Sequence, residues 1–197
     1  MSGAGGRRHH DKISDEASKN HPDFQLPWIP AILNGPNVTI ITETRRIENN
    51  GQVANSMFND TLVHSEGMKA RIQLRRPCLE PDSLSGVEDM LIITIGNGLD
   101  GKSGRAHGGF SSLVLDHITG TSAARESQST APSTAYLHVD YKNPVPTPCV
   151  ISARAWVTEI SGRKVFVKGV LDDGRGTGLA TAKALFVMAR TEPKSSL

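Results

Sequence analysis

Apolar and polar residues alternate along several stretches of the chain, with the period of strands that bury one face. From position 69, Ala70, Ile72 and Leu74 alternate with charged or amide residues, and 90–95 is an almost continuous apolar run that predicts a more deeply buried strand. Four more segments with strand patterns follow at 134–141, 150–160, 164–171 and 178–189. Short turns between strands predict antiparallel neighbours, because a parallel connection needs a dozen or more residues.

A helical period runs from residue 110 to about 120–124. At about 100° per residue, Phe110, Val114 and Ile118 fall within one arc of about 80°, whereas Asp116 falls near 240°. We therefore expect the apolar stripe to face a sheet and Asp116 to point away, towards a cleft or a second subunit. A carboxylate at such a position is more often simply solvated. The pattern as a whole predicts an α+β protein, with one long helix across a curved antiparallel sheet of about six strands.

The rest of the chain reads as flanking segments and loops. Residues 1–25 contain almost nothing to bury, and we expect a disordered tail. Residues 26–54 begin with an apolar stretch broken by prolines, which predicts an N-terminal arm packed on the domain. The domain itself is expected at 55–190, with loops at 77–89 and 96–106, and a short C-terminal tail at 191–197.

Composition narrows the classes of function. A net charge of +2 over 197 residues is too small to indicate a nucleic-acid partner. Cys78 and Cys149 are too few for a disulfide framework and lack metal-site spacing, which predicts reduced thiols, no metal, and a cytoplasmic protein. No apolar run approaches the roughly 18 residues of a membrane span, and the N-terminus does not resemble a secretory signal. We therefore expect no membrane association.

Candidate chemistry lies in the turn before the helix, His107-Gly108-Gly109. The backbone N–H groups of this turn lie at the beginning of the predicted helix. There the first N–H groups have no partner within the helix, and the helix dipole favours a negative charge. His107 could take part in chemistry, or it could be a structural cap of the helix. Asp116 follows nine residues after the histidine.

A competing motif precedes this turn. The run Gly96-Asn97-Gly98-Leu99-Asp100-Gly101-Lys102-Ser103 matches the phosphate-loop pattern G-x-x-x-x-G-K-S. A phosphate loop requires its Lys-Ser pair to open a helix. Here Gly104 follows at once and two more glycines come soon after, each costing a helix about 1 kcal/mol. We expect a flexible loop at 96–104, with nucleotide binding as a remote alternative.

Together, the His107-Gly108-Gly109 turn and Asp116 resemble the signature of hotdog-fold acyl-CoA thioesterases. The nearest branch is that of the phenylacetyl-CoA thioesterases and the eukaryotic thioesterase-superfamily proteins. The run 139–146 resembles the strand of that family which ends in a Tyr-x-x-Pro turn, and 178–187 resembles its last strand. The resemblance covers about 55–190. It implies a hotdog fold, a homodimer or homotetramer, and a site at the dimer interface.

The resemblance also implies roles for individual residues. The expected activity is hydrolysis of an acyl-CoA or acyl-carrier-protein thioester without a cofactor. The N–H groups of Gly108 and Gly109 would hold the carbonyl oxyanion, and Asp116 of the facing subunit would be general base or nucleophile. His107 would orient the carbonyl or the turn. A hydroxyl at the beginning of the strand after the helix, Ser133 or Thr134, would place the water.

One residue departs from this pattern. Several relatives carry an asparagine six residues before the histidine, where this chain has Gly101. The departure leaves open a hotdog protein that binds an acyl or polyketide group without hydrolysing it. A separate alternative is a lyase or cyclase of the same fold, in which Asp116 acts as a base on carbon. A further set of basic residues could meet the phosphates of CoA or form a solvated strand face: Arg71, Arg75, Arg76, Lys142 and Arg163.

Overall fold

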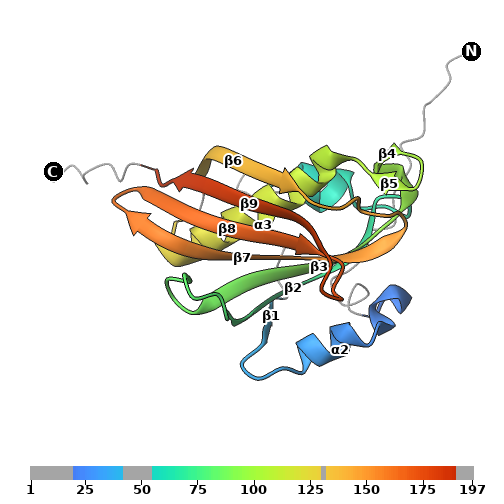
Figure 1. The fold of residues 1–197 in the computed structure, drawn as a ribbon, viewed down its shortest axis with the longest axis horizontal. Helices are drawn as coiled ribbons and strands as arrows, with labels where there is room; N and C mark the ends of the chain where they lie inside the picture. The colour runs from blue at the N-terminus through green and yellow to red at the C-terminus, as the bar shows by residue number, and fades with distance from the viewer. Residues whose placement is uncertain (1–19, 42–54, 130–131, 190–197) are drawn as a thin grey trace, which may run out of the picture.

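A curved antiparallel sheet of seven strands packs against one long helix (Figure 1). The computed structural model describes residues 20–41, 55–129 and 132–189. The strands lie in the order β1-β2-β3-β7-β8-β9-β6. Their bounds are β1 Thr39–Ile41, β2 Met68–Pro77, β3 Val87–Ile95, β6 Ser133–Tyr141, β7 Cys149–Ser161, β8 Lys164–Asp172 and β9 Gly178–Val187. The helix α3, Gly108–Ser127, lies chiefly over β7 and β8, and the predicted α+β architecture is confirmed.

The connection after β6 differs from the expected series of four hairpin-linked strands. β6 pairs with β9 at the edge of the sheet, not with β7, which follows it in the chain. Residues 142–148 instead carry the chain from the edge to the middle of the sheet, where β7 pairs with β3 and β8. Three prolines in this segment, at 144, 146 and 148, are incompatible with a tight hairpin that continues the strand ladder.

The N-terminal segment packs on the face of the sheet opposite α3. It comprises the 3-10 helix η1 (Pro22–Gln25), the short helix α2 (Trp28–Leu33) and β1. Phe24 and Ile29 are buried against a second core formed by residues of β2 and β3: Ala70, Ile72, Leu74, Met90 and Ile92. The C-terminal boundary of the expected tail 1–25 is therefore wrong, because residues 22–25 form η1 and Phe24 is buried. The predictions for 1–19, 42–54 and 190–197 lie outside the described residues.

The buried side of α3 is wider than the predicted stripe. Phe110, Val114 and Ile118 are buried as expected. Three hydroxyl residues of α3 are buried with them, Ser111, Thr119 and Ser122. Two of these have partners inside the fold: Thr119 Oγ1 donates to the Leu115 carbonyl at 2.7 Å, and Ser122 has a carboxylate partner described below. The helix also runs to Ser127, beyond the predicted end at 120–124.

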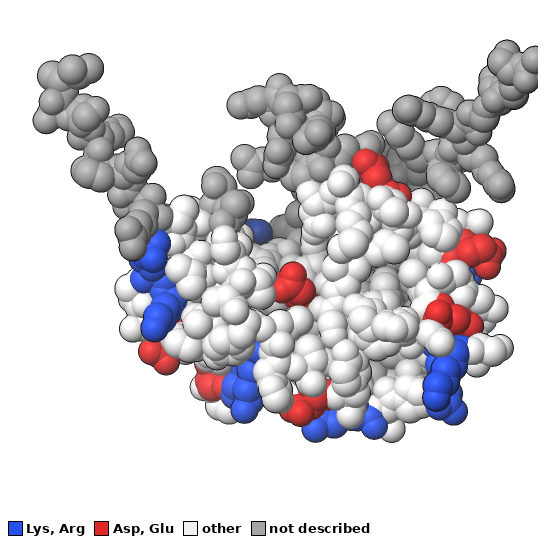
Figure 2. Space-filling view, turned by 90° about the horizontal axis from the view of Figure 1, so that it is seen from above, with Lys and Arg blue, Asp and Glu red and all other residues white. Residues whose placement is uncertain are grey.

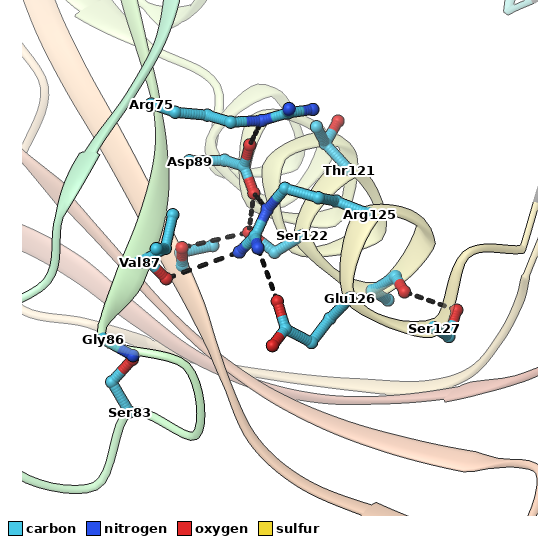
Figure 3. Close-up of polar contacts among 12 residues, drawn as sticks. Arg75, Ser83, Gly86, Val87, Asp89, Thr121, Ser122, Arg125, Glu126 and Ser127 are labelled. Carbon is cyan, nitrogen blue, oxygen red and sulfur yellow. Dashed lines mark hydrogen bonds and ion pairs between the residues drawn. The ribbon is translucent and has the colours of Figure 1, made fainter. Parts of the chain in front are cut away.

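A fully buried carboxylate anchors the C-terminal part of α3 to the sheet (Figure 3). Asp89 of β3 accepts hydrogen bonds from Arg125 Nε and Ser122 Oγ, both at 2.8 Å, and from Arg75 Nε at 3.0 Å. Its neighbour Glu88 is also buried, and it accepts from Arg76 Nε at 2.6 Å. These ion pairs explain why β3 begins at Val87, three residues before the predicted strand. Glu88 and Asp89 are typical of loops in a sequence, but here both pair with β2 as part of the sheet.

No helix in the described ranges is long and apolar enough to cross a membrane. Within the same ranges, no group of three or more His, Cys, Asp or Glu side chains is placed to hold a metal ion. Cys78 and Cys149 are free thiols. Burial raises the pKa of the Cys149 thiol to about 11, so the uncharged form predominates at neutral pH.

Candidate active site

An open cleft of about 600 Å³ lies along the first half of α3. The helix begins where a small hairpin ends, β4 (Asp100–Lys102) and β5 (Arg105–Ala106), preceded by the 3-10 turn η3 (Asn97–Leu99). A short π-helix, η2 (Met57–Thr61), contributes to another wall. The apolar lining is Met57, Leu62, Leu99, Phe110, Leu113 and Leu137, and the polar lining is Asp100, His107, Ser112 and Asp116. One cleft is therefore lined both by the His107 turn and by Asp116.

Asp116 is held at this cleft by the edge strand of its own sheet. Thr134 Oγ1 donates a hydrogen bond of 3.0 Å to Asp116 Oδ1. The expectation that Asp116 points away from its sheet is therefore only partly right: it leaves the core but contacts β6. Of the two candidate hydroxyls, the structure brings Thr134 to Asp116. Ser133 is the neighbouring residue of the same strand, and no contact with Asp116 is observed for it within the described chain.

His107 is the N-cap of α3. Its Nδ1 accepts a hydrogen bond of 2.8 Å from the Gly109 N–H, the arrangement by which a cap satisfies an otherwise unpaired donor. The Gly109 N–H is thus already engaged, which corrects its predicted role as a free oxyanion donor. The Gly108 N–H, by contrast, has no hydrogen-bond partner among the described residues.

The same hydrogen bond fixes the tautomer of the imidazole. Because Nδ1 of His107 accepts a hydrogen bond from Gly109, a neutral ring carries its own hydrogen on Nε2. The side chain is exposed at the cleft, so Nε2–H is available as a donor. The turn therefore presents two donors, the Gly108 N–H and the His107 Nε2–H, rather than two backbone amides.

Gly101 supports this histidine directly. A Cβ at position 101 would lie 2.9 Å from both Cα and Cδ2 of His107. The imidazole therefore occupies the space that a side chain at 101 would need. In this chain, glycine at position 101 is a requirement of the way His107 packs.

Tyr141 completes the support of the turn, and sequence reasoning assigned it no role. Its hydroxyl donates to the Gly108 carbonyl at 3.0 Å and lies 2.6 Å from Ser112 Oγ. The phenol ring also approaches Gly108 closely, because a Cβ added to that glycine would lie 3.4 Å from the ring carbons. The Tyr-x-x-Pro pattern was the signal that could have identified it, because this tyrosine is the last residue of β6.

His117, the next residue after Asp116, belongs to the support behind the cleft. Its ring stacks on Phe58 of η2 with centroids 3.9 Å apart, and its Nδ1 lies 3.2 Å from the Asn55 amide nitrogen. Burial, reinforced by the positive charge of Arg71, lowers the pKa of His117 from 6.5 to about 4. The ring is therefore neutral at pH 7.

The two polar parts of the cleft are too far apart to act on one bond within one chain. His107 and Asp116 are nine residues apart, and at a rise of about 1.5 Å per residue this separates them by about 13 Å along α3. Within one chain, the two groups therefore lie at different ends of the cleft along α3.

The phosphate-loop alternative does not fit the structure. Lys102 and Ser103 belong to the β4–β5 hairpin, and the helix opens only at Gly108. The motif therefore lacks the strand-turn-helix context that positions phosphates at a helix N-terminus.

Comparison with known proteins finds one family whose model matches α3 and most of the strands that follow it. Residues 103–180 match the family model described as thioesterase superfamily. The acyl-coenzyme A thioesterase THEM4 of Xenopus laevis is 39% identical over 90 residues, which are 45% of this chain and 40% of that protein. THEM4 of Mus musculus is 34% identical over 100 residues, 50% of this chain and 41% of that protein. The chain thus spans less than half the length of these relatives.

A solved structure agrees at the level of the fold. The thioesterase-type protein yhdA from Lactococcus lactis superposes with a TM-score of 0.50 over 54% of this chain and 84% of that chain, at 11% identity. The superposition agrees with a long helix packed against an antiparallel sheet, the arrangement described above. Residues 103–180 of this chain are therefore similar to the thioesterase superfamily, and the chain has the hotdog fold.

Proposed function

We propose that this protein is an acyl-CoA thioesterase whose reaction site is completed by a second copy of the chain. The observation that carries the proposal is the single cleft lined by Asp116 and by the His107 turn, with an apolar wall between them. The curated relatives named acyl-coenzyme A thioesterase support the choice of substrate.

The His107 turn polarises the thioester carbonyl. Hydrolysis places negative charge on the carbonyl oxygen as water adds to the carbon. The Gly108 N–H and the His107 Nε2–H donate to that oxygen, and a well-placed donor of this kind contributes about 3–4 kcal/mol to the transition state. Tyr141 holds the Gly108 carbonyl, and the capping bond holds the imidazole, so both donors are fixed before substrate arrives.

Asp116 acts as the general base. Thr134 occupies one carboxylate oxygen as a donor, which leaves the other oxygen to accept a proton from water. The water oxygen bonds to the carbonyl carbon, the carbon–sulfur bond breaks, and the proton passes to the departing thiolate. The products are the carboxylic acid and free CoA.

The second copy follows from the separation along α3. A twofold axis that passes beside α3, perpendicular to the helix and level with its middle turns between 107 and 116, brings Asp116 of one copy towards the His107 turn of the other. The edge strand β6 is the natural contact: among the described residues no strand pairs with its outer side, and Tyr136 and Tyr141 are 47% and 56% exposed on it. The side of the molecule on which β6 lies is largely uncharged (Figure 2).

Thiol release from a panel of short, long and aromatic acyl-CoAs tests the proposal. We expect Asp116→Asn to abolish turnover with the fold and oligomeric state unchanged, and Thr134→Ala to lower kcat about tenfold, with recovery in Thr134→Ser. Glu159→Gln, an exposed carboxylate at the far end of β7, is the matched control and should retain full activity.

Complementation separates a shared site from two independent ones. Mixing Asp116→Asn with His107→Ala chains and allowing subunits to exchange should restore activity, since half of the sites in a mixed dimer then contain both intact groups. Full turnover by Asp116→Asn, or no recovery in exchanged mixtures, would contradict the corresponding part of the proposal.

A further inference from the structure

The β4–β5 hairpin carries two cations in an unfavourable arrangement. Lys102 and Arg105 are paired directly opposite each other across the hairpin, and both are exposed. Like charges at opposite positions of a two-stranded ladder repel and destabilise it. Neither cation has an ion-pair partner within the described part of the chain.

The nearest acid does not relieve this repulsion. Asp100 lies in the same hairpin, but its carboxylate accepts the Gly104 N–H at 2.8 Å and the Thr147 hydroxyl. It is thus committed to the shape of the turn. In contrast, three of the basic residues singled out in the sequence have internal partners: Arg75 with Asp89, Arg76 with Glu88, and Arg71 with Asn59.

The hairpin is also rigidly mounted. The Thr147 N–H donates to the Gly104 carbonyl, and the Ala106 N–H donates to the Val145 carbonyl at 3.0 Å. Gly104 has φ +73°, a backbone conformation that favours glycine and closes the turn tightly. The backbone positions that carry the two cations are therefore fixed before any ligand binds, which lowers the cost of ordering a binding site for an anion.

The position of the pair indicates which anion it serves. β5 runs directly into His107, and residues Gly98 to Asp100 before the turn line the cleft. Taking the proposed function as its basis, we infer that Lys102 and Arg105 bind the phosphate groups of CoA at the mouth of the site. The thioester lies at the His107 turn, the pantetheine arm leaves the cleft past η3, and the phosphates meet the two cations of the hairpin.

The inference predicts an effect that depends on the phosphates of the substrate. In Lys102→Ala/Arg105→Ala, we expect KM for an acyl-CoA to rise about tenfold with kcat unchanged. The same variant should hydrolyse the S-acyl-N-acetylcysteamine thioester, which has no phosphate, at the wild-type kcat/KM. Added salt should raise the wild-type KM for acyl-CoA and have little effect on the variant.

The matched control removes two exposed cations elsewhere. Lys164→Ala/Lys183→Ala changes the net charge equally; Lys164 begins β8, at the opposite end of the sheet from the β4–β5 hairpin, and Lys183 lies within β9 (Figure 1). It should leave KM unchanged. An equal loss in both double variants, or an equal loss on both substrates, would overturn the inference. A raised KM for acyl carrier protein thioesters with acyl-CoA unaffected would also overturn it.

A binding measurement keeps the inference separate from the proposed function. Calorimetric titration of the wild type with free CoA should give a Kd about tenfold below that of the hairpin variant. This difference needs no turnover. Absence of hydrolysis with every thioester would defeat the proposed activity alone, whereas equal CoA affinities would defeat the hairpin site alone.

Discussion

Replacing Asp89 by asparagine tests whether a buried charge anchors α3 to the sheet. The substitution keeps the size of the side chain and removes its negative charge. Asp89 is completely buried and accepts from Arg125 and Ser122 on one oxygen and from Arg75 on the other (Figure 3). Asparagine has a single carbonyl oxygen, so at most one of these two sets of donors keeps an acceptor.

The expected loss follows from the number and environment of the bonds. A hydrogen bond to a charged group contributes about 1.5–3 kcal/mol, and the bonds that remain to asparagine are weakened because they lose the charge. The side chain of Arg75 is 41% exposed and recovers hydration, whereas that of Arg125 is 15% exposed and keeps only its contact with Glu126 as an ion pair. We expect a loss of about 3 kcal/mol in the free energy of unfolding.

Urea unfolding at pH 7 and one fixed protein concentration measures this loss. For a chain of this size, a slope near 2 kcal/mol per molar urea converts about 3 kcal/mol into a midpoint lower by about 1.5 M. Glu159→Gln, an exposed carboxylate, should change the free energy by less than about 0.5 kcal/mol. A loss below about 1 kcal/mol for Asp89→Asn, with an unchanged slope, would refute the view that the buried charge stabilises this junction.

Two further predictions concern the support of the cleft. Because the pKa of His117 is lowered to about 4, the unfolded chain gains a proton below pH 6.5 that the folded chain does not accept, so stability should fall by about 2 kcal/mol from pH 7 to pH 5. Urea unfolding at the two pH values should show that His117→Gln removes most of this difference, and an equal slope in both proteins would contradict it. Gly101→Ala forces a Cβ within 2.9 Å of His107, so we expect about 1–3 kcal/mol lower stability in thermal unfolding and a reduced kcat. Gly178→Ala, where a Cβ meets nothing within 4 Å, is the control and should be neutral.

Strand and helix positions were accessible from the sequence because each element buries one regular face. The alternation of Ala70, Ile72 and Leu74 predicted β2, and the period of Phe110, Val114 and Ile118 predicted α3. Strand order was not accessible, because nothing in the local pattern of 142–148 says how far the chain travels before it pairs again. Nor was the beginning of β3, since a buried Asp89 is possible only with arginines that arrive from distant positions.

The candidate site was likewise predictable in part from the sequence. The sequence identified the residue types, and the resemblance identified Asp116 and the His-Gly-Gly turn. The hydrogen-bond partners within the site could not be predicted from the sequence, because they depend on how the elements lie in space. Only the structure shows that the Gly109 N–H donates to His107, and that Thr134 rather than Ser133 contacts Asp116. The explanation for Gly101 likewise needed the position of the imidazole.

The passage of residues 142–148 from the edge to the middle of the sheet also bears on the order of folding. β2 with β3, and β7 with β8 and β9, are hairpins between neighbours in the chain and can form early. Joining them pairs Ile95 with Cys149, across a loop that contains all of α3 and β6. Such closure is slow because its entropic cost precedes the contacts that reward it. We expect the union of these two halves, with α3 enclosed between them, to limit the folding rate.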